Sequence, residues 1–444
     1  MRGKAAHGDG RFWSLRPALS MPQAFMPKRI SRADLTKIAA LLATAAIMLL
    51  ANGLQGTLVP MRGHLEGFSD TALSMQGFAY FFGFVAGCLA CPYLVARVGH
   101  VRAFAILTAL TAAIVLMLPI AIGPVIWGMF RAGIGFCAAG MFAVLEGWLN
   151  QQAPNAKRGR IFTLYAGINN LALLGGQYLF TLGDTRGPAL FSLCAILTVL
   201  CLIPIGLTRQ VEPQRVALPK LRVVHLYRVS PVGVIGAVIV GLTGGAFWTL
   251  APVFANSRGL TGDGVALFMS VTILGGAVAQ WPLGRASDFM DRRIVIGCAS
   301  AMASIAGLML AVPIPFGFSS SPWLLAAGFF YGLSAFPIGS LTNAHLNDHA
   351  AQEEMTEFAS SNLFVYGTAA MIGPVIAAGV IKLGGLNAIF FYTAAIHAAF
   401  VAFVLYRMLM RAAVRSEDRG AFNVATTQAS GAVHFAPADV KSEA

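Results

Sequence analysis

Two charged residues lie inside one long apolar stretch of the chain, residues 124–150. The stretch is long enough to cross a membrane, yet it carries Arg131 within the apolar run and Glu146 near its far end. A charge at membrane depth costs roughly 2.5–3.5 kcal/mol on insertion scales, so such a residue usually lines a polar cavity or pairs with another group. A surface helix of a soluble protein would turn both charges to water, but this stretch has no polar face. The two residues therefore predict a site inside a membrane protein.

The spacing of Arg131 and Glu146 excludes a direct ion pair between them. On a helix they lie about 22 Å apart along the axis and within about 60° of one face. A guanidinium keeps its proton, so Arg131 needs an acid, carbonyl groups, water or an anionic substrate as its partner. Bonds to carbonyls of neighbouring helices would make Arg131 structural. We favour the alternative, in which both side chains face one cavity.

The composition of the chain is that of an integral membrane protein. Of its 444 residues, 57% are hydrophobic and 11% are charged, whereas a soluble domain carries about 25% charged residues. Apolar windows of about 20 residues, the length that crosses a bilayer, recur along the chain. They predict an all-α membrane protein with twelve transmembrane helices, at residues 36–59, 70–95, 101–121, 124–150, 160–182, 187–208, 230–256, 262–286, 293–313, 322–346, 357–382 and 387–410.

Basic residues gather on one side of these predicted helices. The turns after the second, fourth, sixth and eighth helices hold most of them, within residues 97–102, 157–160, 209–228 and 285–293. Because Lys and Arg mark cytoplasmic loops, we predict that both termini lie in the cytoplasm and that the protein resides in the cytoplasmic (inner) membrane. The formal charge of +13 is explained by these loops and needs no nucleic-acid partner.

The predicted helices form two similar halves. WLNQQA (148–153) is echoed by HLNDHA (345–350), and a shift of 197 residues places Asn150 on Asn347 and Gly176 on Gly373. Duplicated six-helix halves are one of the architectures of secondary transporters. The predicted organisation is a disordered basic segment (1–33), a first six-helix bundle (34–208), a cytoplasmic linker (209–229), a second six-helix bundle (230–410) and a disordered cytoplasmic tail (411–444).

Short motifs make residues 35–410 resemble the major facilitator superfamily. That family carries the loop signature G-x-x-x-D-R/K-x-G-x-R/K-R/K after its second helix, often with a second copy after its eighth. The second copy here, GRASDFMDRR, keeps Gly284, Asp288, Arg292 and Arg293. The first copy, PYLVARVGHVR, keeps Arg97, Gly99 and Arg102 but has Pro92 and Ala96 where the family has Gly and Asp.

Two further runs strengthen this resemblance. RAGIGFCAAG (131–140) is similar to the family's helix-four motif R-x-x-Q-G-x-G-A-A, with Ile134 in place of Gln. The E-x-W-L-N run at Glu146–Asn150 resembles the YcaD-like bacterial branch, which is uncharacterised and offers no substrate. The resemblance implies the twelve-helix fold of this superfamily and transport by alternating access.

The charged loops predict a gate on the cytoplasmic side. Asp288 can accept bonds from backbone N–H groups at a neighbouring helix N-terminus, and the two arginines after it can pair with acids at nearby helix ends. Such a cluster would latch the halves together; the alternative is a solvated turn, since exposed ion pairs contribute only ~0–1 kcal/mol. The predicted gating network is Arg97, Gly99, Arg102, Glu146, Asn150, Gly284, Asp288, Arg292 and Arg293.

Glu146 has two interpretations within this network. Because Ala96 removes the acid from the first loop copy, we expect Glu146 to compensate by pairing with Arg97 or Arg102. Alternatively, it is a titrating carboxylate on the transport path. The first predicted helix lacks the carboxylate that proton antiporters of the resembled superfamily often pair with the helix-four arginine. Proton coupling therefore stays open, with Glu146 the embedded carboxylate and His397 the weaker candidate.

Amide and aromatic side chains are predicted to complete a cavity around Arg131. Each alone is explained by packing, but together with one fixed positive charge they suit a small anionic or amphiphilic organic solute. The candidates are Asn52, Gln55, Tyr165, Asn169, Trp248, Tyr331 and Asn362, joined by Asn170, Phe247 and Tyr366 on the same helices.

Together these features predict a secondary active transporter, for efflux or uptake, with proton coupling as an option. The alternatives are a membrane receptor or assembly factor on the same fold, and an uncoupled facilitator. The sequence has no G-x-S-x-G, H-E-x-x-H or Walker-type run, so we expect no enzyme activity, cofactor or metal. The expected partners are the solute, the lipid bilayer and protons, without nucleic acid, and the expected state is a monomer.

Overall fold

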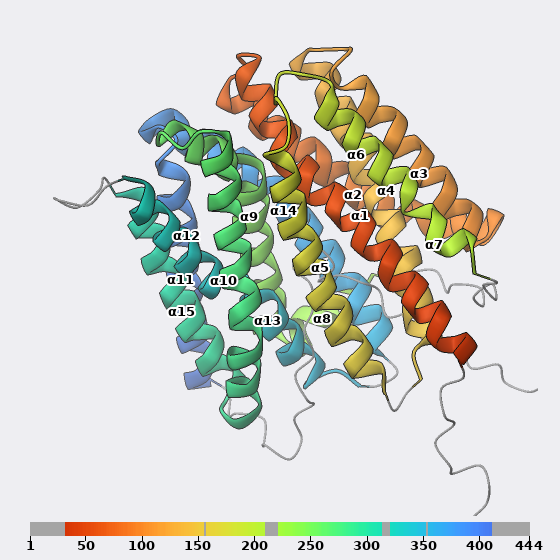
Figure 1. Ribbon diagram of the computed structural model, residues 1–444. Coiled ribbons are helices and arrows are strands. Elements are labelled where there is room, and N and C mark those ends of the chain that lie inside the picture. Colours follow the sequence, from red (N-terminus) through yellow and green to blue (C-terminus); the bar gives the residue numbers. More distant parts are fainter. Residues whose placement is uncertain (1–31, 155–156, 209–220, 313–319, 352–353, 411–444) are drawn as a thin grey trace, which may run out of the picture.

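The computed structural model describes residues 32–154, 157–208, 221–312, 320–351 and 354–410, and every regular element within these ranges is a helix (Figure 1). The segments predicted to be disordered, 1–33 and 411–444, fall almost wholly outside the described residues, as does most of the predicted linker. The first half comprises α1 (Arg32–Leu65), α2 (Asp70–Val98), α3 (His100–Met117), α4 (Pro124–Gln152), α5 (Arg158–Phe180), α6 (Ala189–Leu200) and α7 (Leu202–Gly206). The second half comprises α8 (Val223–Val229), α9 (Pro231–Ser257), α10 (Gly262–Phe289), α11 (Arg292–Ala311), α12 (Ser320–Ala335), α13 (Pro337–Asn347), α14 (Met355–Gly384) and α15 (Ala388–Met410).

Eleven helices of the described ranges are long and apolar enough to cross a membrane, when α6–α7 and α12–α13 are each taken as one. The exception among the twelve predicted spans is 160–182, which is α5. Its charged and amide residues, such as Arg160, Asn169 and Gln177, lower its hydropathy. It nevertheless packs against α1 of its own half and α10 of the other. The chain is a multi-pass membrane protein.

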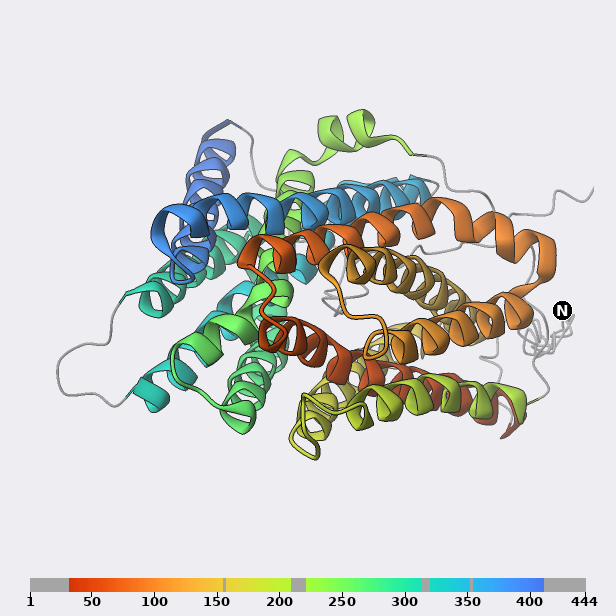
Figure 2. The ribbon, with the colours of Figure 1, turned by 90° about the horizontal axis from the view of Figure 1, so that it is seen from above.

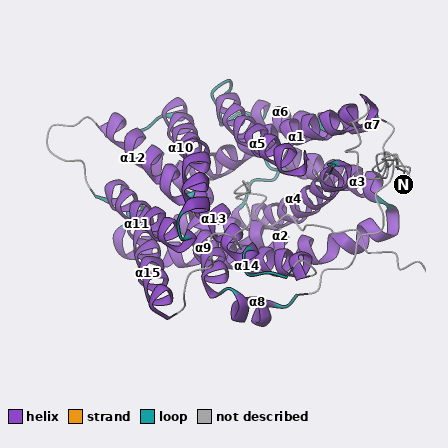
Figure 3. Cartoon of the chain, turned by 90° about the horizontal axis from the view of Figure 1, so that it is seen from below, coloured by secondary structure: helices purple, strands orange, loops and turns teal. Residues whose placement is uncertain are grey.

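Two predicted helices, 187–208 and 322–346, are each broken into two pieces. The first breaks at Cys201, between α6 and α7, and the second at Phe336, between α12 and α13. Proline explains both breaks: Pro204 and Pro337 have no N–H for the carbonyl four residues earlier, so the helix cannot continue unchanged. The predicted linker also contains a short helix, α8, which lies against α14 at the edge of the second half (Figure 3).

Glycines let paired helices approach closely in both halves. A Cβ at Gly135 of α4 would lie 1.9 Å from the backbone oxygen of Tyr80 in α2. The second half repeats this contact, because a Cβ at Gly332 of α12 would lie 1.8 Å from the backbone oxygen of Thr272 in α10. Gly135 and Gly332 are related by the shift of 197 residues seen in the sequence, so the two halves pack in the same way.

The two halves meet along a few helices. α2 runs beside α14, as Figure 2 shows, while α5 meets α10 and α9 meets α1 and α2. Gly77 of α2 packs on Thr249 of α9, and Phe180 at the end of α5 approaches Gly262 at the start of α10. Residues of both halves therefore surround the space between α1, α2, α4, α9 and α14.

Candidate functional site

A central pocket lies between the two halves and contains Arg131. The guanidinium carbon of Arg131 stacks 4.4 Å from the centroid of the Tyr80 ring. Such a cation–π contact stabilises the charge by about 0.5–2 kcal/mol, depending on how much water is removed. The pocket encloses about 620 Å³ of empty space, open mouth included, and is lined by Asn52, Gly56, Tyr80, Phe81, Phe84, Arg131, Phe142, Trp248, Thr249 and Tyr366.

The close packing of α2 on α4 places these two side chains. Tyr80 and Arg131 face each other across the point where Gly135 and Gly83 let the two backbones touch. Sequence reasoning missed Tyr80, because nothing in the spacing of the two residues shows that their helices cross there. Within the described residues, no ion pair to Arg131 is found, so the ring and the cavity are its environment.

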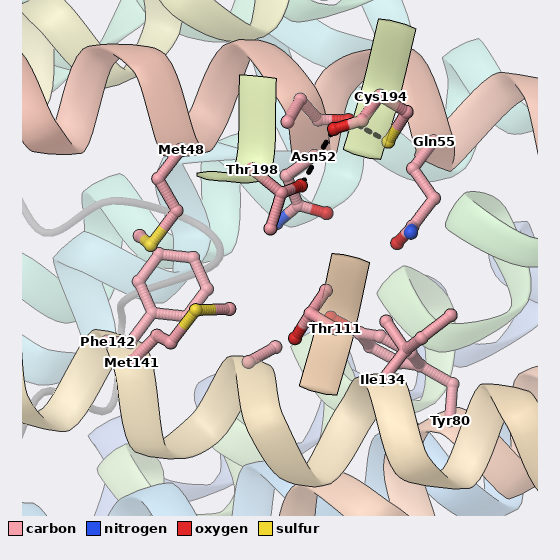
Figure 4. A pocket seen from close by; sticks show the side chains of 12 residues that line it. Met48, Asn52, Gln55, Tyr80, Thr111, Ile134, Met141, Phe142, Cys194 and Thr198 are labelled. Carbon is pink, nitrogen blue, oxygen red and sulfur yellow. Dashed lines mark hydrogen bonds between the residues drawn. The ribbon is translucent and has the colours of Figure 1, made fainter. Parts of the chain in front are cut away.

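A side pocket lies beside the central one in the first half, and Figure 4 shows its lining side chains converging from α1, α2, α3, α4 and α6. It shares Asn52, Tyr80 and Phe142 with the central pocket. Its lining is apolar and neutral, with thioethers, a thiol, hydroxyls and one further amide: Met48, Ala51, Gln55, Thr111, Ile134, Ala138, Met141, Cys194 and Thr198. Neither lining contains a carboxylate, so Arg131 is the one charged group among the residues of the two pockets.

The predicted cavity residues divide into those that line these pockets and those that lie elsewhere. Arg131, Asn52 and Trp248 line the central pocket together with Tyr366, and Gln55 lines the side pocket. Tyr331 instead belongs to an aromatic cluster of the second half, with its ring 5.6 Å from Phe247 and 5.5 Å from Phe390.

Two amides predicted for the cavity lie outside these pockets. Asn362 donates to the side-chain oxygen of Asn343 at 2.6 Å and is buried between α13 and α14. Asn169 is buried on α5, one turn after Tyr165. These wrong predictions have the same cause. The sequence shows that a residue is an amide or an aromatic, but it does not show in which direction that side chain points from its helix.

Glu146 pairs with a phenol instead of an arginine. Tyr165 donates from its hydroxyl to Glu146 Oε1 at 3.0 Å, whereas Arg97 and Arg102 are exposed. No ion pair joins Glu146 to either arginine in the part of the chain that the structure describes. The predicted compensation is therefore not what the carboxylate does, because its oxygen accepts from Tyr165 of α5 instead. Glu146 and Tyr165 are each only 3% exposed.

The second loop copy forms a buried charge cluster. Arg292 donates to Asp348 at 2.7 Å, and these side chains are 2% and 3% exposed. Arg292 also donates to Ser287 at 2.9 Å and pairs more loosely with the half-exposed Asp288 at 3.4 Å. The predicted pairing of an arginine with an acid at a helix end is present, since Asp348 directly follows α13.

These pairs bear on two details of the predicted latch. Asp288 pairs with Arg292 one turn further on, and its bonds to a neighbouring helix N-terminus stay a prediction. The ion pairs of the cluster also join α10, α11 and the end of α13, all within the second half, so they hold that half together. Asp348 was missed as a partner, although the acidic run at 345–357 was a usable signal.

Arg293 and Asp291 form a local pair at the start of α11. The Arg293 side chain donates to Asp291 at 2.7 Å, and the Arg293 backbone N–H donates to it at 3.0 Å, which caps the helix. Burial alone would raise the pKa of Asp291, but these bonds and the arginine charge bring it below its ordinary value.

A carboxylate with a lowered pKa stabilises the fold above its ordinary pKa, and that stabilisation is lost as the pH falls through the folded-state value. We therefore expect the wild type to be more stable than Asp291→Asn at neutral pH, with the difference in Tm shrinking below about pH 3.8, the ordinary value. Thermal melts of both proteins across this range check the prediction. A difference that stays constant as the pH falls would contradict it.

The remaining predicted gating residues have structural surroundings. Gly99 alone separates α2 from α3 and adopts φ 83°, a left-handed conformation that favours glycine. Gly284 is buried in α10, and its carbonyl accepts from Ser287. Asn150 is buried near the end of α4, and its carbonyl accepts from Arg158 at 3.5 Å.

A second charged contact joins the linker side of the chain to α14. His225 of α8 lies 3.1 Å from Glu354, and Arg222 lies 3.3 Å from Glu357. The Arg222 backbone N–H also donates to Ser361 at 2.8 Å. These contacts fasten α8 to the start of α14, as Figure 3 shows for the two helices.

Comparison with known proteins decides the family. The protein-family model for the Major Facilitator Superfamily matches residues 41–229 and 233–435, which is most of the chain. The chain belongs to the major facilitator superfamily. It is therefore a membrane transporter by family, a class that is not enzymatic, and the resemblance seen in its loop motifs is confirmed.

The names of similar proteins within this superfamily state the transporter family but no substrate. The chain is 25% identical over 376 residues to a protein of Escherichia fergusonii named "Uncharacterized MFS-type transporter YcaD", covering 84% of this chain and 94% of that one. A protein of the same name from Shigella flexneri is 25% identical over 382 residues, with the same coverage. The resemblance of the Glu146–Asn150 run to this branch thus extends along the chain.

Solved structures of superfamily members share the fold. The nucleoside transporter NupG has a TM-score of 0.69 at 12% identity, covering 85% of this chain and 99% of that chain. A D-xylose-proton symporter has a TM-score of 0.67 at 15% identity, covering 87% and 99%. At these identities the likeness concerns the arrangement of helices alone.

Proposed function

We propose that the protein is a secondary active transporter of the cytoplasmic membrane that carries a small organic anion with an apolar part. Its two six-helix halves, twelve spans in all with α5 among them, alternate access to the central pocket. The observation that carries this proposal is the Arg131 guanidinium, held over the Tyr80 ring in a pocket built by both halves.

The position of the pocket supports alternating access. Asn52, Tyr80 and Arg131 come from the first half, whereas Trp248 and Tyr366 come from α9 and α14 of the second. A solute bound there touches both halves, so rocking one half against the other changes its contacts and its exposure. Binding sites at the interface of two repeats are the rule for transporters of this kind.

The lining of the two pockets supports the class of solute. A positive charge with no carboxylate beside it favours an anion, and removing water strengthens that attraction. The side pocket offers the flexible thioethers of Met48 and Met141 and the ring of Phe142, which adapt to irregular apolar groups. An anionic head at Arg131 and an apolar arm among these residues would fill both spaces.

A thermal-shift screen tests this site. Purified wild type is melted with carboxylates and phosphate monoesters that bear short or long apolar arms. A bound solute at a hundred times its Kd stabilises the folded state by about 2.7 kcal/mol. We expect stabilising compounds to lose their effect in Arg131→Ala and keep it in Arg186→Ala, a matched change at an exposed arginine. If a compound still stabilises the Arg131→Ala variant, Arg131 does not bind that compound.

An uncoupled facilitator is the second candidate, because the described lining of the central pocket holds no carboxylate to carry a proton. Proteoliposomes loaded with a stabilising compound separate the two. Accumulation of that compound against its own gradient, driven by an imposed pH or sodium gradient, requires the coupled mechanism. Equilibration without accumulation under either gradient would establish the facilitator.

A further inference from the structure

A second polar site lies between α4 and α5, one turn along α4 from Phe142 of the solute pocket. It consists of Glu146 on α4 and Tyr165 and Asn169 on α5, which are 3%, 3% and 2% exposed. Tyr165 donates to Glu146 Oε1 at 3.0 Å. Glu146 Oε2 and both amide atoms of Asn169 have no hydrogen-bond partner among the described residues. A buried oxygen in this situation costs about 1–3 kcal/mol, and more for a charged group.

The charged groups around this site leave the carboxylate without a cation. On α2 and α3, which pack against α4, Arg97 and Arg102 are exposed. His100 of α3 stacks on Trp148, with ring centroids 6.0 Å apart. On α5, Arg158 bonds to the carbonyl of Asn150. Lys37 lies near the start of α1, which also packs on α4.

None of these groups forms an ion pair with Glu146 in the described ranges, and Tyr165 is the titratable group bonded to it. A carboxylate at membrane depth without a cation requires another source of compensation. A proton on Oε2 supplies it, because the neutral acid carries no charge and turns the unpartnered oxygen into a donor. The amide oxygen of buried Asn169, on the same helix as Tyr165, is an acceptor of matching chemistry.

We propose that Glu146, Tyr165 and Asn169 form a proton-binding site that couples proton movement to transport. This inference rests on the proposed function and specifies its driving ion. In the step proposed, the O–H bond of the Glu146 carboxylic acid breaks, its proton passes to water, and the resulting carboxylate keeps the bond from Tyr165. The charged form favours a conformation in which the end of α4 meets water, whereas the protonated form tolerates burial.

The geometry separates the proton-binding carboxylate from the arginine of the solute pocket. Arg131 and Glu146 lie on one continuous helix, α4, about 22 Å apart along its axis. Proton and solute therefore do not compete for one group. They influence each other through the position of α4 and α5, and such coupling acts equally in both directions.

Infrared difference spectroscopy at two pH values tests the proton site with pH itself as the probe. The wild type in lipid, brought from acidic to alkaline buffer, is expected to lose a carboxylic-acid C=O band that is absent from Glu146→Gln. Glu66→Gln is the matched control, because it makes the same change at a carboxylate already paired with Arg62. Tyr165→Phe is expected to shift the frequency and the midpoint of the band, because Oε1 loses its donor. A band of equal size in the wild type and Glu146→Gln would overturn the proposal.

The ion is tested in the same measurement. Replacing choline chloride by sodium chloride at constant pH should leave the band unchanged, and a sodium-dependent loss of the band would assign the site to a metal ion instead. If Glu146→Gln fails to fold, Glu146→Asp serves, with a band at a shifted midpoint expected and its complete absence contradicting the proposal. No solute is needed, so a negative result here leaves the Arg131 pocket standing, and loss of ligand binding there leaves this site standing.

Discussion

Asp348→Ala is expected to lower the free energy of unfolding by about 3–5 kcal/mol, because it removes the closest and most buried acid from the buried Arg292 guanidinium. The pair is almost completely removed from water, at 2% and 3% exposure, and its closest approach is 2.7 Å. Removing one partner of such a pair costs far more than the pair contributes, since the remaining charge cannot regain its hydration. The midpoint of thermal or denaturant unfolding in detergent measures the effect.

Two further variants sharpen this prediction. Asp288→Ala removes the other acid of Arg292, but that side chain is 36% exposed and lies at 3.4 Å, so we expect a loss of less than about 1 kcal/mol. The double variant Arg292→Met with Asp348→Leu removes both charges and should recover most of the stability lost in Asp348→Ala. Equal losses for Asp348→Ala and Asp288→Ala would show that burial does not decide the strength of this cluster.

Gly135→Val is expected to prevent the normal packing of the first half. A Cβ at this position would lie 1.9 Å from the backbone oxygen of Tyr80, and backbone atoms cannot move aside as a flexible side chain can. Overpacking typically costs 1–3 kcal/mol, and a backbone clash of this kind should cost about 3 kcal/mol or more. Because the same contact places Tyr80 over Arg131, the variant should also lose ligand-induced stabilisation.

Gly128→Val is the matched control on the same helix, since nothing lies within 4 Å of a Cβ built there. It should elute as a single peak in size-exclusion chromatography and melt close to the wild type, whereas Gly135→Val should aggregate or melt well below it. A well-folded Gly135→Val protein with unchanged melting would mean that α2 and α4 pack less closely than the structure shows.

The sequence alone determined the features that depend on local chemistry. Long apolar windows follow from the thickness of a bilayer, so an all-helical membrane protein with two similar halves could be predicted, together with the superfamily whose loop motif surrounds Asp288 and Arg292. The need of Arg131 for a polar environment followed from its charge. One feature of these helices was predicted wrongly, because Pro204 and Pro337 break two helices that hydropathy alone predicts as continuous.

Only the tertiary structure decided which side chains meet. Tyr80 stacks on Arg131, Tyr165 bonds to Glu146, and Asp348 pairs with Arg292, each across a large separation in sequence. Such contacts depend on where two helices cross and on the direction of each side chain around its own axis. An error of one residue changes that direction by about 100°. Residue type therefore indicates what chemistry a position can perform, while the packing of helices decides whether Tyr331 or Tyr366 faces the pocket.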